Sequence, residues 1–267
     1  MKKEFLHKNN YSFFKKIFIK ISRKIGFEII DQSKFFVPTA KLQLNENLSI
    51  FNKKNITFPL GEIKITRKIN SFLVIFRSFT NENKLLSQNK KRIFEKNKKE
   101  YTFKSLNSLC ISIKECQKKV SNIKFFLKII DDNSSLEVIK NLKKIANKFK
   151  IKNEITSLNI EKYANEMKFH NNKRMLAHNA HIFDSKLYAK NSDYDLIFFV
   201  EDDYLHQQEA ISEMLYTYQK LSSIIGEDVI LCPTDYPYLY NKLENTVILA
   251  GQNRHWRKIE ESLCTYL

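Results

Sequence analysis

The sequence predicts an α/β fold with a mostly parallel sheet flanked by helices, and three observations lead to this prediction. Short apolar runs alternate with segments of helical pattern, as in folds built from strand–helix–strand units. The 267 residues are 43% hydrophobic and include 21 Phe and 12 Tyr, which is enough apolar surface for a real core. Only four Gly and four Pro are present, which excludes collagen-like and low-complexity classes.

Strand-like and helical segments alternate from about residue 71 onward. The first run, SFLVIF at residues 71–76, is short, apolar and rich in strand formers, which is typical of a buried strand. Further strands are predicted at residues 122–130, 151–159, 194–200 and 228–233, and short ones at 245–251 and 262–267. Helical patterns lie at residues 101–117, 136–149, 171–190 and 207–224.

The chain before residue 71 has a different character. Residues 1–30 read as a basic amphipathic helix and residues 31–70 as an irregular extension. Apolar residues recur at helical spacing (Phe14, Ile17, Phe18, Ile21, Ile25), with basic residues between them (Lys15, Lys16, Lys20, Arg23, Lys24). This pattern fits a helix at the interface of an anionic membrane, or alternatively a helix packed on its own domain or on a partner. No apolar run reaches the roughly 18–20 residues of a membrane span, and lysines interrupt any signal-peptide core.

The charge balance favours anionic partners. The chain has 46 Lys and Arg against 29 Asp and Glu, a net charge of +17, which suits nucleic acid, an anionic membrane face or phosphorylated small molecules. A solvated, lysine-rich surface explains the same numbers. No RNP, helix-turn-helix or zinc pattern occurs, so no nucleic-acid partner is expected. The four Cys form no CxxC pair and are expected to be reduced, which points to the cytoplasm.

Polar clusters follow three of the predicted strands. RSFTN follows the first strand, DDNSS the second, and the fourth runs directly into EDDY at residues 201–204. Ligands of open α/β sheets bind at the carboxyl ends of the strands. An acidic triplet at such an edge suits Mg²⁺, which takes one or two protein carboxylates together with substrate phosphates. Taken alone, the triplet also fits an ordinary exposed turn.

Three motifs, IIDDNSS (129–135), KRMLAHNA (173–180) and IFFVEDDY (197–204), resemble in order and spacing those of family 2 inverting glycosyltransferases. The resemblance covers roughly residues 71–231. It implies a GT-A fold, which is Rossmann-like, for a catalytic domain at residues 71–267. It also implies a metal-dependent glycosyltransferase of hexosyltransferase type. Such an enzyme moves a sugar from a nucleotide-diphosphate donor to a glycan or lipid-linked acceptor with inversion, as in cell-surface polysaccharide biosynthesis. With the basic helix, this predicts a peripheral enzyme on the cytoplasmic membrane.

The resemblance also assigns roles to individual residues. Asp132 would hydrogen-bond the donor base, and Asp203 would bind Mn²⁺ or Mg²⁺. Glu201 and Asp202 would face the donor's sugar and ribose.

Other assignments rest on matched positions. Arg174 and Asn179 match the Arg and Asn of the family's helix segment, five residues apart. Arg77 stands near where the family has a Thr or Ser, then Tyr-Asn, so the first loop departs from the pattern. Arg77 is kept as a substrate-binding candidate.

The resemblance does not assign the general base to a residue of this sequence. In the family it is a carboxylate well downstream of the metal motif, so it is expected beyond Leu267, with the chain truncated. Asp235 and His255 are the substitutes within the sequence. Two other functions remain as alternatives. A sugar-phosphate nucleotidyltransferase usually has a Gly-rich loop after its first strand, which RSFTN lacks. A non-enzymatic nucleic-acid binder would use the positive charge alone.

Overall fold

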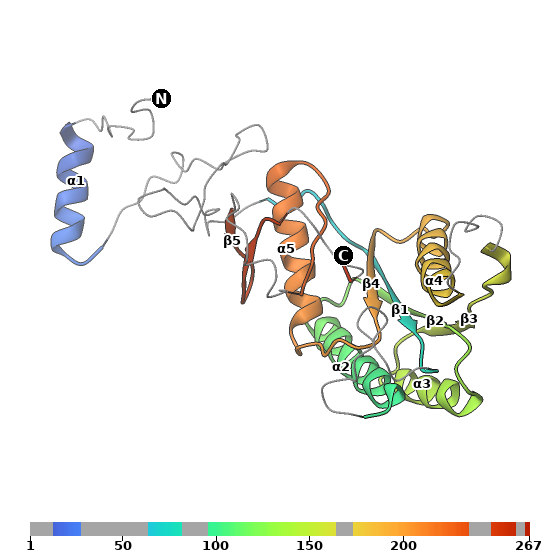
Figure 1. Ribbon diagram of the computed structural model, residues 1–267. Helices are drawn as coiled ribbons and strands as arrows, with labels where there is room; N and C mark the ends of the chain where they lie inside the picture. The colour runs from blue at the N-terminus through green and yellow to red at the C-terminus, as the bar shows by residue number, and fades with distance from the viewer. Residues whose placement is uncertain (1–12, 28–63, 82–95, 164–172, 235–246, 260–264) are drawn as a thin grey trace. The chain divides into compact units, whose positions relative to one another are not determined.

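The computed structural model describes residues 13–27, 64–81, 96–163, 173–234, 247–259 and 265–267. The chain divides into two compact units, residues 1–38 and 39–267. The first unit contains helix α1 (Phe13–Lys24), and the second contains all other described elements (Figure 1). Within the described residues, no helix is long and apolar enough to cross a membrane.

Four parallel strands form the sheet of the second unit, in the order β3-β2-β1-β4. Strand β1 (Ser71–Ser78) lies between β2 (Lys124–Asp131) and β4 (Leu196–Glu201). The short strand β3 (Asn153–Ser157) pairs with the outer side of β2. The prediction of a parallel sheet from these four segments is therefore confirmed.

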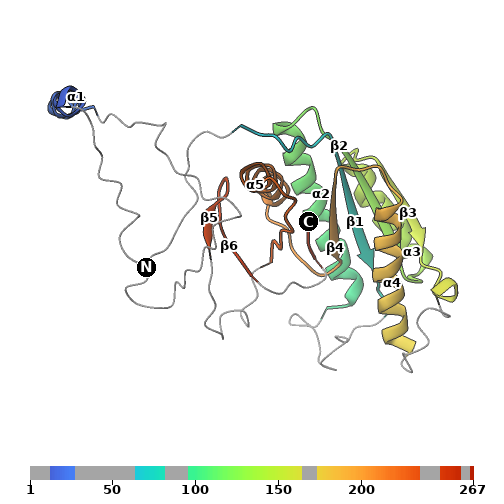
Figure 2. The same cartoon turned by 90° about the horizontal axis from the view of Figure 1, so that it is seen from above.

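Helices cover both faces of this sheet. Helices α2 (Lys98–Lys119), α3 (Leu136–Lys148) and α5 (Ala210–Ile225) pack on one face, and α4 (Lys173–Lys190) covers the other (Figures 1 and 2). A short 3-10 helix, η2 (Glu161–Tyr163), precedes α4. Each of the first three crossovers thus runs strand, helix, parallel strand, as expected for an α/β fold.

The alternation of side chains along β1 divides the core into two layers. Phe72, Val74 and Phe76 belong to the cluster with α2, α3 and α5, whereas Leu73 and Ile75 belong to the cluster with α4. All five side chains are fully buried. A central parallel strand is covered on both faces, which explains why its sequence is continuously apolar rather than alternating.

A hairpin of β5 (Ile248–Ala250) and β6 (His255–Arg257) is attached to α5. The buried carboxylate of Glu213 on α5 accepts hydrogen bonds from the backbone N–H of Gln252 (3.1 Å) and of Asn253 (2.7 Å). It also accepts one from the indole Nε1–H of Trp256 (3.0 Å). One acidic side chain therefore satisfies the turn of the hairpin.

The prediction of a strand at residues 228–233 is wrong. Leu231 exchanges two backbone hydrogen bonds with Leu267 and forms no ladder. The outer side of β4 is occupied instead by Tyr266, which forms an antiparallel bridge to Phe199. This bridge is all that the described residues keep of the strand expected at 262–267, since 260–264 lie outside them. Of the extension expected at 31–70, only residues 64–70 are described, and they contain no helix or strand.

Candidate functional site

The carboxyl ends of three strands meet at one edge of the sheet. In the register of β1, Ser78 is paired with Asp131 of β2, and Arg77 with Glu201 of β4. The polar segments that follow these strands therefore start side by side. This arrangement is what the positions of the three polar clusters predicted.

Asp131 holds the turn after β2 in place. Its side chain is 1% exposed and accepts hydrogen bonds from Ser78 Oγ (2.6 Å) and from the backbone N–H of Ser134 (2.8 Å). The backbone N–H of Asp132 donates to the carbonyl of Ser78 at 2.9 Å. Asn133 adopts the left-handed region (φ 51°), which Asn tolerates better than most residues. Asp131 is thus the structural member of the pair of aspartates.

Asp132, predicted to contact the donor base, follows directly. Its side chain is buried and accepts a hydrogen bond from Asn133 Nδ2 at 3.1 Å. Burial raises the pKa of Asp132, and the neighbouring charge of Asp131 raises it further. A hydrogen bond donated by an N–H group would stabilise the charged carboxylate in this buried setting.

The loop after β1 is tied to the loop after β2. Thr80 Oγ1 donates to Ser134 Oγ (2.7 Å), and Asn81 Nδ2 donates to the carbonyl of Asn133 (2.6 Å). The first loop departs from the family pattern in sequence, but it shares one hydrogen-bonded surface with the turn of Asp132.

The three carboxylates of the acidic triplet have different environments. Glu201 is half-buried, and its carboxylate lies 3.4 Å from the guanidinium of the buried Arg77. Burial raises the pKa of Glu201 although Arg77 acts in the opposite direction, and the charges of Asp203 and Asp202 add to the increase. Asp202 is buried, whereas Asp203 is exposed. The three carboxylates therefore differ in burial, and their charges are offset by two basic side chains, Arg77 at Glu201 and Lys98 at Asp202 and Asp203.

Asp202 is the most strongly anchored of the three. It accepts hydrogen bonds from the backbone N–H of Phe79 (3.0 Å) and from Thr102 Oγ1 (2.8 Å), and it pairs with the ammonium group of Lys98. The side chain of Lys98 is only 4% exposed, and its Nζ also lies 3.5 Å from Asp203. Asp202 thereby joins the loop after β1, the start of α2 and the end of β4.

Lys98 and Thr102 were missed by sequence reasoning. They start α2 one turn apart, with Ser105 continuing the same side of the helix, and all three are buried. These polar residues at helical spacing, just before the apolar residues of the same helix, are the pattern that could have drawn attention to them. The sequence alone does not predict that they contact the acidic triplet.

On the opposite face, α4 brings two imidazoles toward Arg77. The ring of His181 is buried, and its Nε2 lies 2.9 Å from the carbonyl oxygen of Ile130. Burial lowers the pKa of His181 to about 3, with a further contribution from Arg77. Burial also lowers the pKa of His178, again with the help of Arg77. Both rings are therefore neutral at pH 7, and sequence reasoning did not single them out.

The structure says less about Arg174 and Asn179, the two substrate-binding candidates on α4. Arg174 lies in the first turn of α4, but its side chain is outside the described part of the structure. Asn179 is half-buried on the same helix, next to His178. Their proposed roles toward the donor stay predictions.

The candidates for the general base lie elsewhere. Asp235 is outside the described residues. His255 is exposed at the start of β6, where it pairs with Ala250. The neighbouring Arg254 donates a hydrogen bond to Gln207, four positions after Asp203, so the hairpin turn reaches the loop that follows the triplet.

A metal ion would have to rely mainly on one carboxylate of this site. The described residues contain no group of three or more His, Cys, Asp or Glu side chains arranged to hold a metal. The exposed carboxylate of Asp203 fits the way in which Mg²⁺ binds with a phosphate ligand, through one or two protein carboxylates. Both oxygens of Asp202 already accept from protein donors.

Comparisons with protein-family models, with curated proteins and with solved structures found no match. A functional assignment therefore rests on the residues of the site and on the sequence motifs.

Proposed function

We propose that this protein is a metal-dependent glycosyltransferase that transfers a sugar from a nucleotide-diphosphate donor with inversion at the anomeric carbon. The observation that carries the proposal is the edge shared by β1, β2 and β4. There the turn of Asp132 and the triplet that contains Asp203 are joined through the loop after β1. The two motifs that the resemblance assigns to the base and to the metal thus belong to one hydrogen-bonded surface.

Each residue would act through its own environment. Asp132 would accept a hydrogen bond from an N–H of the base. Asp203 would hold Mn²⁺ or Mg²⁺, which when bound supplies Lewis-acid stabilisation of the departing diphosphate. Asp202, fixed by Lys98 and Thr102, would orient Asp203 and so act as a positioning residue. Arg77 and Glu201 would face the sugar side of the donor as a charge pair.

In the transfer step, the acceptor oxygen forms a bond to the anomeric carbon while the bond from that carbon to the diphosphate breaks. The electron pair leaves with the diphosphate, and the acceptor hydroxyl gives its proton to a general base. Asp235 and His255 remain the candidates for this base within the sequence. The acceptor is proposed to be a glycan or a lipid-linked sugar.

Release of nucleotide diphosphate tests the proposal. The full chain is incubated with a panel of uridine, guanosine, cytidine and thymidine diphosphate sugars, Mn²⁺ and simple sugar acceptors. At least one donor should release its nucleotide diphosphate faster with the protein than without it, and chelation with EDTA should abolish this release. The Asp203→Asn variant is the matched control. If no donor is consumed and no nucleotide diphosphate binds, the proposal is wrong.

A further inference from the structure

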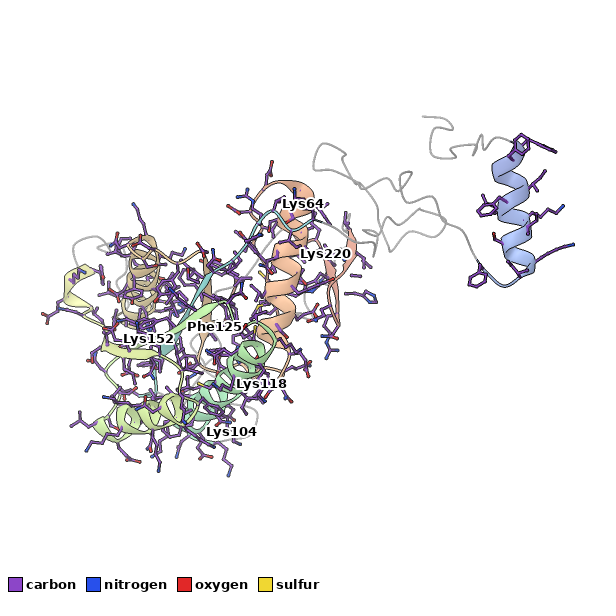
Figure 3. The ribbon with its side chains drawn as sticks, turned by 180° about the vertical axis from the view of Figure 1, so that it is seen from behind. Lys64, Lys104, Lys118, Phe125, Lys152 and Lys220 are labelled. Carbon is purple, nitrogen blue, oxygen red and sulfur yellow. The ribbon has the colours of Figure 1, made fainter. Side chains whose placement is uncertain are left out.

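Helix α1 and the turn that follows it concentrate the exposed apolar side chains of the described chain. Of the twelve large apolar side chains that are exposed in the described residues, seven lie between residues 13 and 27. Their exposed fractions run from 41% to 81%, and they belong to Phe13, Phe14, Ile17, Phe18, Ile21, Ile25 and Phe27. Figure 3 shows side chains projecting from this helix on more than one side. Among the described residues of this unit, 13–27, no side chain covers this set.

The exposed apolar side chains of α1 share one face, whereas the half-buried Ile19 lies outside it. At 100° per residue, Phe13, Phe14, Ile17, Phe18 and Ile21 fall within an arc of about 140°. The exposed lysines Lys20 and Lys24 lie at one edge of this arc. A long lysine side chain in that position can reach past the apolar face with its ammonium group.

The end of the helix adds to this face. Gly26 has a φ of 91°, which only glycine adopts without cost, and the backbone N–H of Phe27 donates to the carbonyl of Ser22 at 2.9 Å. This is the hydrogen bond of a glycine-terminated helix, in which an apolar residue after the glycine lies against the last turn. The backbone at Ile25 and Phe27 is therefore hydrogen-bonded to the last turn of α1.

We propose that α1 together with Ile25 and Phe27 is a docking surface for an anionic membrane. Charge selects this occupant, because the sequence FFKKIFIKISRK contains five basic residues and no acidic one. A second copy would bring another basic helix and a net charge of +17, so self-association through this face is opposed by repulsion. Anionic lipid headgroups complement the lysines, and acyl chains accept the Phe and Ile side chains.

The helix would lie in the plane of the membrane. Its twelve residues span about 18 Å, which is less than the roughly 30 Å of a bilayer core. Amphipathic helices of this kind bury their apolar face at the boundary between headgroups and acyl chains. The inference does not depend on the proposed function, since α1 belongs to a unit of its own. If both hold, the transferase would work beside lipid-linked acceptors.

Vesicle co-sedimentation of the full chain tests the proposal. The chain should sediment with vesicles of phosphatidylcholine mixed with phosphatidylglycerol, and only weakly with phosphatidylcholine alone. Replacing Lys20 and Lys24 together by Gln should weaken binding to the anionic vesicles about thirtyfold, given the attraction of each lysine to an anionic surface. Raising the salt concentration should weaken the wild-type chain and have less effect on this variant.

Two further variants separate the apolar term from non-specific effects. Phe14→Asp places a charge on the 81% exposed ring position and should abolish vesicle binding. The matched control Ile230→Asp makes the same kind of change at a 73% exposed apolar position of the other unit and should bind like wild type. Asp203→Asn should also bind vesicles normally, whatever its effect on donor turnover.

Three results would overturn the inference. Equal binding to both kinds of vesicle removes the selectivity for anionic lipid, and no binding to either removes the lipid partner. Unchanged binding by Phe14→Asp removes the apolar face. A wild-type dimer in size-exclusion chromatography that Phe14→Asp converts to a monomer, without vesicle binding, identifies a second copy as the occupant.

Discussion

Replacing Asp202 by Asn should strongly destabilise the second unit. The asparagine amide oxygen can still accept from Thr102 and Phe79, but the N–H₂ group, which is a donor, then faces the ammonium of Lys98. Both side chains of this ion pair are more than 90% buried. Breaking a buried pair from one side costs about 3–5 kcal/mol, because the remaining charge stays buried.

The residual contact of Lys98 with Asp203, at 3.5 Å, reduces this cost toward the lower limit. We expect a loss of about 3 kcal/mol in the free energy of unfolding, measured by urea titration with circular dichroism. Asp203→Asn is the control, and because its carboxylate is partly exposed it should cost less than about 1 kcal/mol. The double variant Asp202→Leu, Lys98→Met should be more stable than Asp202→Asn. Equal effects of the two single aspartate variants would refute this reasoning.

The remaining predictions concern the hairpin and the buried imidazole. A Cβ at Gly251 would lie 2.0 Å from Glu213 Oε1 and 2.8 Å from Trp256 Nε1, so Gly251→Ala should cost about 1–3 kcal/mol and shift the fluorescence of Trp256, the only tryptophan. An unchanged spectrum and stability would contradict this geometry. The fold lowers the pKa of His181, so this residue lowers the free energy of unfolding wherever the unfolded chain binds the proton and the folded chain does not. Stability is therefore complete above about pH 6.5 and is lost as the pH falls toward 3. Between pH 6.5 and 5 the fold should lose about 2 kcal/mol from this group, and His181→Gln should reduce that slope.

The sequence predicted the sheet well because its local signals agree with its tertiary environment. The run from Leu73 to Phe76 is apolar at every position, and every one of these side chains is buried between two helical layers. The spacing of Phe14, Ile17 and Ile21 likewise predicted a helix, which α1 confirms. The strand expected at 228–233 failed for a non-local reason. An apolar run such as VILC becomes a strand only where a sheet edge is free, and Tyr266 takes that edge.

The site was predictable in part. That Asp132 and the acidic triplet would follow strands of one parallel sheet, and so lie at the same edge of it, came from the alternation of strands and helices. The sequence did not predict that Asp202 is buried against Lys98 and Thr102 or that Asp203 is exposed. These contacts join residues about 100 positions apart, and no local pattern encodes such pairing. The burial of His181 was not predictable either, because nothing in the helical pattern of α4 distinguishes its position from the others.

Metal-dependent binding of a nucleotide diphosphate tests the central claim most directly. Titration calorimetry of the full chain with uridine, guanosine, cytidine and thymidine diphosphates, each with Mn²⁺ and with EDTA, measures it without knowledge of the acceptor. We predict that one nucleotide binds only with Mn²⁺ and that Asp203→Asn weakens this binding at least about 100-fold. Binding that is equal in Mn²⁺ and EDTA, or equal in wild type and Asp203→Asn, would contradict the account.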